Sequence, residues 1–157
     1  MLGVLTVLAA AVAAGSQAPQ DEAEHLRPPR AVAIREAVEW LVANQRADGA
    51  WGSHHSPRPI EVLCSVPGGH QAFRVATTAL CVMALDGSPY WTEASRAAAD
   101  RGIDLILAEH EVTRANALEH YTPWALGFGL QCLSERLLAR PDDARAAEMR
   151  RVCERLI

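Results

Sequence analysis

Residues 44–52 read NQRADGAWG and stand between two stretches in which apolar residues recur at helical spacing. The pattern before the segment stops at Asp48 and Gly49. Glycine can adopt a positive φ after a helix, and an aspartate side chain can accept a hydrogen bond from the turn backbone. The segment therefore predicts a helix over residues 30–45 that ends in a sharp turn.

A long connection and two more helices are expected after this turn. Residues 50–69 contain three prolines, which exclude a long helix there. Residues 71–85 are apolar on almost every side, which is typical of a buried helix. Residues 92–110 form an amphipathic pattern, with Thr92 as the expected N-cap and Gly102 as a weak point of the helix.

The last part of the chain predicts two further helices. Thr122 is expected to be the N-cap of a helix that extends to residue 140, with Pro123 at the first helical position. The sequence Pro141-Asp142-Asp143 is expected to start another helix that continues to residue 157, because acidic residues favour the amino end of a helix. Residues 111–120 give no clear pattern.

The predicted helices alternate in character, and this alternation indicates the fold. The first, third and fifth carry charges on one side, whereas the second and fourth are apolar on most sides and contain small residues. The chain has 29 alanines, the best helix former, and no convincing strand pattern. Alternating outer and inner helices are typical of stacked helical hairpins. The sequence thus predicts an all-α fold.

Composition limits the classes of function. The 157 residues include 15 basic residues, all of them arginine, and 19 acidic residues, which gives a net charge of −4. This balance argues against general binding of nucleic acids. The apolar fraction of 50% is that of a globular protein rather than of a disordered chain.

The amino-terminal residues indicate export. Residues 1–14 (MLGVLTVLAAAVAA) are uncharged and too short to span a bilayer as a helix, but they fit the apolar part of a secretory signal peptide. We therefore expect a signal peptide at 1–18, a disordered leader at 19–29 and a periplasmic or extracellular location. The alternatives are an uncleaved membrane anchor, a buried amino-terminal helix and a misassigned start.

The same turn segment has the form Q-x-x-D-G-x-W-G and resembles the QW-type repeat of the terpenoid cyclase and protein prenyltransferase superfamily, which folds as an α/α toroid. The helix patterns on both sides also match, so the resemblance covers residues 30–157. It implies that Gln45 caps the next helix, that Asp48 and Gly49 make the turn, and that Trp51 packs on the glutamine. A planar amide against an indole makes a large contact at little entropic cost. These roles are structural rather than catalytic.

The resemblance covers only part of a toroid. The later helices lack the full motif, and the chain offers about two and a half helical hairpins, whereas a closed toroid of this superfamily uses about six. The resemblance therefore implies stacked hairpins that form part of an α/α toroid, with a cavity for an apolar or extended ligand. It also implies the amino-terminal part of a longer protein or a truncated product.

The motifs that carry chemistry in this superfamily are absent. Neither D-x-D-D nor D-D-x-x-D occurs in the chain, and the zinc ligands of the prenyltransferases cannot be matched by position. One group of possible zinc ligands lies in the long connection, although its spacing matches no standard zinc site. The residues of this group are His54, His55, Cys64 and His70. Ligand binding by the loop and ordinary solvation are the alternatives, and no cofactor is expected.

Four cysteines are present, without a C-x-x-C pair. Cys81, Cys132 and Cys153 fall in helical apolar patterns, and we expect them to pack as small buried side chains. Disulfides that involve these residues or Cys64 are the alternative in an exported chain.

Three classes of function follow. The first is an exported, non-catalytic repeat protein with a binding or scaffold role, which the missing acid motif favours. The second is the amino-terminal part of a toroid enzyme, such as a terpene cyclase or mutase, a transferase or a lyase, whose catalytic residues lie outside this chain. The third, an unrelated helical interaction domain, is disfavoured by the motif from Gln45 to Trp51. No nucleic acid is expected as a partner. Contact with a membrane is expected only if the signal peptide is not cleaved.

Overall fold

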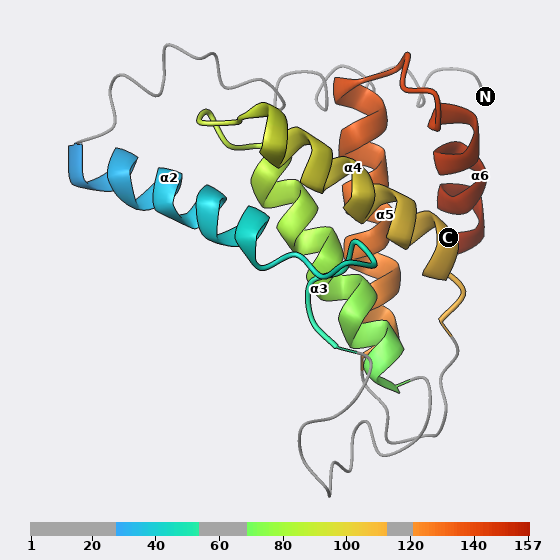
Figure 1. The fold of residues 1–157 in the computed structure, drawn as a ribbon. Helices are drawn as coiled ribbons and strands as arrows, with labels where there is room; N and C mark the ends of the chain where they lie inside the picture. Colours follow the sequence, from blue (N-terminus) through green and yellow to red (C-terminus); the bar gives the residue numbers. More distant parts are fainter. Residues whose placement is uncertain (1–27, 54–68, 113–120) are drawn as a thin grey trace, which may run out of the picture.

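The computed structural model describes residues 28–53, 69–112 and 121–157, which contain five helices and no strand (Figure 1). The helices are α2 (Pro28–Ala43), α3 (Gly69–Asp86), α4 (Glu93–Glu109), α5 (Thr122–Ala139) and α6 (Ala146–Leu156). The expected all-α fold is confirmed for these residues. None of the described helices is both long enough and apolar enough to cross a membrane. The predicted signal peptide at 1–18 lies outside the described residues.

Several helix ends differ from the predicted ones. α2 begins at Pro28, inside the segment expected to be a disordered leader, because a proline is tolerated in the first turn of a helix. Thr92 caps α4 as predicted: its Oγ1 accepts a hydrogen bond from Ser95 N at 3.1 Å, in a capping box. The predicted cap of α5 is wrong, because Thr122 is already helical and Tyr121 is the N-cap.

The inner layer of the fold consists of α3 and α5, which pack against each other and are parallel (Figure 1). The rings of Phe73 and Tyr121 meet near the amino ends of the two helices, with centroids 5.3 Å apart. Arg136 and Asp86 meet near the carboxyl ends, with Nη1 and Oδ2 2.6 Å apart.

The outer layer consists of α2, α4 and α6. α4 is antiparallel to α3, because Glu109 at its carboxyl end pairs with Arg74 near the start of α3, whereas Gly102 at its middle lies against Val82. α2 has the same direction as α4, because Arg35 in its first half lies over the ring of Tyr90, before α4, whereas Gln45 after its end bonds to Ala98 within α4.

α6 is likewise antiparallel to its inner neighbour, α5. Cys153 Sγ lies 3.9 Å from Ser134 Oγ, and Leu156 reaches back to Gly129. The three outer helices thus share one direction, opposite to that of the two inner helices. This is a repeat-like arrangement of helical hairpins.

The core is centred on Trp51, which is 3% exposed. A Cβ atom added at Gly102 would overlap Val82 Cγ2 and would lie 3.1 Å from Trp51 Cζ3. The sequence marks Gly102 as a weak point of α4, but the structure shows that close helix packing requires glycine there. The main core contains, besides this tryptophan, Val38, Ala79, Val82, Leu85, Ile103, Ile106, Leu133, Met149 and Val152.

An ionic cluster around the buried Arg136 joins the carboxyl ends of α3 and α5 to α4 and to the turn before α6. Arg136, which is 2% exposed, pairs with Asp86, Asp100 and Asp143. Arg145 contributes a second guanidinium, 3.0 Å from Asp100 and 2.9 Å from Asp143. The prediction that Asp143 stands at a helix start is wrong, because α6 begins only at residue 146 and this carboxylate is held by two arginines.

The three cysteines of the described residues are free thiols. Cys132 is buried, and Cys81 and Cys153 pack against the core, which confirms the expected packing. Burial raises the pKa of Cys81 to about 11 and raises that of Cys132 even further. These thiols are therefore protonated at neutral pH. Cys64 lies outside the described residues.

The close packing at Gly102 can be tested by adding one methyl group. Gly102→Ala is expected to lower the free energy of unfolding by about 1–3 kcal/mol, because the new Cβ overlaps Val82, although alanine is the better helix former. Gly127→Ala on α5 is the matched control, since nothing lies within 4 Å of a Cβ there, and it is expected to be neutral or stabilising by about 1 kcal/mol. Urea unfolding followed by circular dichroism measures both, and equal effects would contradict the packing argument.

The ionic cluster should make stability depend on acid pH. Hydrogen bonds from Arg145, with the charges of Arg145 and Arg136, hold the pKa of Asp143 well below its usual range. A carboxyl group with a lowered pKa in the folded state stabilises the fold above its unfolded pKa, and this contribution is lost as the pH falls. We expect the free energy of unfolding to fall from about pH 5 to about pH 2.

Asp143→Asn should flatten this profile and lower the free energy of unfolding by about 1–3 kcal/mol at neutral pH, because buried donors lose an ionised acceptor. Urea unfolding at a series of pH values provides the measurement. Parallel pH profiles of the parent protein and the variant would refute the role of Asp143.

Candidate functional site

The predicted turn motif fastens α2 to α4 through Gln45. Its Nε2 donates hydrogen bonds to Gly49 O at 2.9 Å and to Ala98 O at 2.8 Å, and its Oε1 accepts one from Arg101 Nη2. The resemblance implies that Gln45 caps the next helix. Among the described residues, its partners are instead its own turn and the middle of α4.

Gly49 and Asp48 shape the turn itself. Gly49 has a φ of +87°, and a Cβ atom there would lie 2.6 Å from Arg101 O, so the position requires glycine. Asp48 Oδ1 accepts a hydrogen bond from Ala50 N at 3.1 Å, and its Oδ2 lies 2.9 Å from Arg74 Nη2. The turn is therefore bound to α3 as well as to α4.

Trp51 completes the motif by joining three helices. Its indole Nε1 donates to Leu41 O at 2.8 Å, and its backbone N donates to Thr78 Oγ1 at 3.1 Å. The ring contacts α4 at Gly102. These contacts fasten the turn to α2, α3 and α4.

Of the four possible zinc ligands, only His70 belongs to the residues that the structure describes. His54, His55 and Cys64 lie outside the described residues, and His70 Nδ1 lies 3.2 Å from Ser53 O. Within residues 28–53, 69–112 and 121–157, no three His, Cys, Asp or Glu side chains are grouped so that they could hold a metal. His54, His55, Cys64 and His70 thus stay candidate ligands only, beside the alternatives of ligand binding by the loop and ordinary solvation.

A second buried arginine lies near the amino end of α3. Arg74 is 4% exposed and pairs with Glu109, with Nη1 and Oε1 2.7 Å apart, and with Asp48. Gln71 Nε2 also donates to Glu109, at 2.7 Å. Two carboxylates thus compensate one guanidinium, so this cluster links elements of the fold.

The residues that the structure describes leave one side of the inner helices exposed, which we call the inner-helix face. α3 packs on α4 through Val82, whereas Leu80, about 200° away around the helix, is 45% exposed. On α5, Trp124 and Leu138 are 50% and 59% exposed, and space is open at Gly127. The inner-helix face consists of Phe73, Thr77, Leu80 and Ala84 on α3 and of Trp124, Gly127, Gln131, Glu135 and Leu138 on α5.

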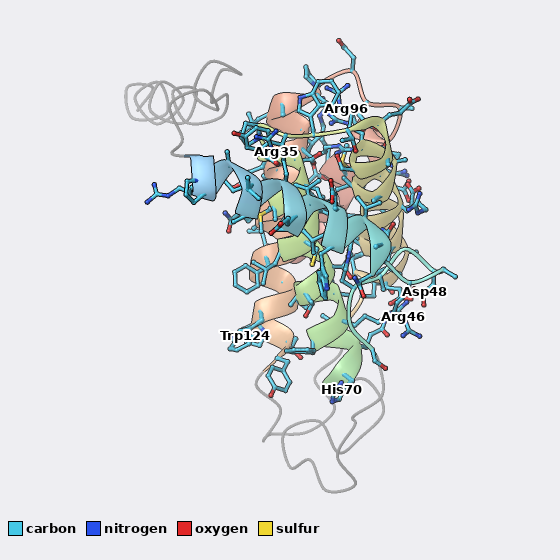
Figure 2. All side chains as sticks on the ribbon, turned by 60° about the vertical axis from the view of Figure 1, so that its left-hand side comes forward. Arg35, Arg46, Asp48, His70, Arg96 and Trp124 are labelled. Carbon is cyan, nitrogen blue, oxygen red and sulfur yellow. The ribbon has the colours of Figure 1, made fainter. Side chains whose placement is uncertain are left out.

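Four rings form a row across the amino ends of the inner helices. The ring centroids of His70 and Phe73 are 6.0 Å apart, those of Phe73 and Tyr121 5.3 Å, and those of Tyr121 and Trp124 5.5 Å, each pair edge to face. Figure 2 shows His70 and Trp124 at the same end of the molecule. The row ends in the exposed indole of Trp124, which offers a rigid apolar surface to a ligand.

The inner-helix face has the chemistry of a binding surface. Glu135 is its single charged member, and its Oε1 accepts a hydrogen bond from Gln131 Nε2 at 2.8 Å. No histidine or cysteine belongs to the face. Comparison of the chain with protein-family models, with curated proteins and with solved structures finds no match.

The role of Gln45 in the turn can be tested with an isosteric change. Gln45→Glu is expected to lower the free energy of unfolding by about 2 kcal/mol, because a carboxylate cannot donate to Gly49 O and Ala98 O. Asn44→Asp is the control: Asn44 Nδ2 donates to Trp40 O at an exposed position, and the expected loss is below about 1 kcal/mol. Urea unfolding measures both variants. Equal losses would show that Gln45 does not hold the turn.

Proposed function

We propose that this chain is a non-catalytic helical-repeat protein that binds an apolar or extended ligand on the inner-helix face. The observation that carries the proposal is the joint exposure of Leu80, Trp124 and Leu138 on two helices that pack against each other. Several exposed apolar side chains on packed helices are typical of a binding site, because proteins otherwise keep such exposure small.

We also propose that the two-layer array is an arc of an α/α toroid. The parallel inner pair, the antiparallel outer helices and the Q-x-x-D-G-x-W turn from Gln45 to Trp51 support this proposal. In such an arc, the inner helices line the cavity and the outer helices face the solvent. The inner-helix face would then be the surface that a ligand meets.

The composition of the face favours a ligand with a neutral, elongated body. Its rings and aliphatic side chains suit apolar groups, and it contains no basic residue that would attract an anion. Gln131 and Glu135 supply polar atoms midway along α5. Trp124 and Leu138 are about 21 Å apart along the helix axis, at about 1.5 Å per residue, which suits an extended molecule.

Titration of the full chain with the neutral apolar dye Nile red tests this proposal. Dye fluorescence should rise on binding, and Trp124→Ala should weaken the affinity about fivefold, because loss of a ring contact costs about 1 kcal/mol. Trp40→Ala is the matched control. Trp40 is 61% exposed on α2, outside the inner-helix face, so its removal should leave the affinity unchanged.

Two outcomes would contradict the proposal. The first is the absence of a saturable dye site on the parent protein. The second is an equal loss of affinity in both tryptophan variants, which would mean adsorption to any exposed indole. Circular dichroism spectra of the two variants verify that their helices are intact.

A further inference from the structure

Two arginines from different helices stack on neighbouring aromatic rings in the turn between α3 and α4. Arg35 of α2 has its Cζ 4.6 Å from the centroid of the Tyr90 ring. Arg96 of α4 has its Cζ 3.3 Å from the centroid of the Trp91 ring. Figure 2 shows Arg35 and Arg96 at the end of the molecule opposite His70. These stacked residues form what we call the arginine–aromatic patch: Arg35, Tyr90, Trp91 and Arg96.

The arginines of the patch differ from the buried arginines of the fold. Arg136 and Arg74 are buried and compensated by carboxylates, whereas Arg35 and Arg96 are exposed and form no ion pair with any described residue. Stacking on a ring fixes the plane of a guanidinium and covers one of its faces, while its N–H edge stays available. Arg35 Nε donates a hydrogen bond to Ala31 O at 3.4 Å, and neither guanidinium forms an ion pair with a residue that the structure describes.

We propose that the arginine–aromatic patch is a docking site for an acidic segment of a partner protein, which places one carboxylate on Arg35 and another on Arg96. A guanidinium binds a carboxylate through two parallel hydrogen bonds, and a fixed plane adds geometric specificity. Arginine, tryptophan and tyrosine are also the residues that contribute most to binding at protein interfaces. Trp91 is 40% exposed and supplies the apolar contact beside the charges.

The charges around the patch favour a peptide over a continuous anionic surface. Glu36 and Glu39 on α2 and Glu93 on α4 are exposed and close in sequence to the two arginines. A bilayer of anionic lipids or a nucleic acid would bring negative charge against these glutamates as well, and like charges repel. A peptide can place its carboxylates at the two guanidinium groups alone. This inference does not depend on the function proposed for the inner-helix face.

The test uses the full chain and a fluorescently labelled peptide that carries two glutamates separated by neutral residues, with binding followed by anisotropy at low ionic strength. The double variant Arg35→Gln, Arg96→Gln should bind the peptide about tenfold more weakly than the parent protein, because two charge-assisted contacts are lost. The matched control is Arg150→Gln, Arg151→Gln. These two arginines are exposed on α6, and their loss changes the net charge by the same amount, so the control should bind like the parent.

A second variant separates geometry from charge. Arg35→Lys, Arg96→Lys keeps both positive charges but loses the planar fork, and it should bind about threefold more weakly than the parent. All these side chains are exposed, so the variants should keep the far-ultraviolet spectrum of the parent.

Three results would overturn the proposal. The first is an absence of saturable peptide binding by the parent protein. The second is an equal loss in the α6 control, which would mean general electrostatic attraction. The third is tighter binding to phosphatidylglycerol vesicles or to single-stranded DNA through the same two arginines, which would assign the patch to another class of partner.

Discussion

The contact of the Trp51 indole with the backbone of Gly102 determines how the helices are arranged. The ring hydrogen bonds to the end of α2 through Leu41 O, the backbone of Trp51 bonds to α3 through Thr78, and the indole edge lies against α4. Three helices, α2, α3 and α4, therefore meet at this one residue. A glycine at the contact lets the axis of α4 come close enough for its apolar side chains to reach α3.

The periodic part of the fold could be predicted from the sequence. Burial of one helix face leaves a regular apolar pattern, and the helix expected at 71–85 is found as Gly69–Asp86. The ends of the helices are harder to predict from the sequence, because contacts with distant parts of the chain determine where a helix begins or ends. Asp143 looked like the start of a helix, but its carboxylate binds Arg136 and Arg145, and α6 begins after that contact.

The candidate site could be predicted in its local part only. The residues of the turn motif could be recognised because they lie close together in one short segment. The partner of Gln45 in α4 could not be predicted, because it is distant in the sequence. Arg136 and Asp86 are 50 positions apart, and an arginine in a helical pattern looks the same in sequence whether it faces water or carboxylates. The exposure of Leu138 could not be predicted either, because α5 is apolar on most sides and this pattern indicates a helix that is buried on all sides.

The hydrogen bond from Gln45 to Ala98 has a consequence for the nascent chain. The two residues are 53 positions apart, so at about 5–20 residues per second α2 leaves the ribosome about 3–10 s before its partner helix. During that interval the indole of Trp51 has no α4 to cover it, and the first hairpin exposes apolar surface. The hydrogen bond that fastens the turn after α2 therefore forms only after α4 has been synthesised.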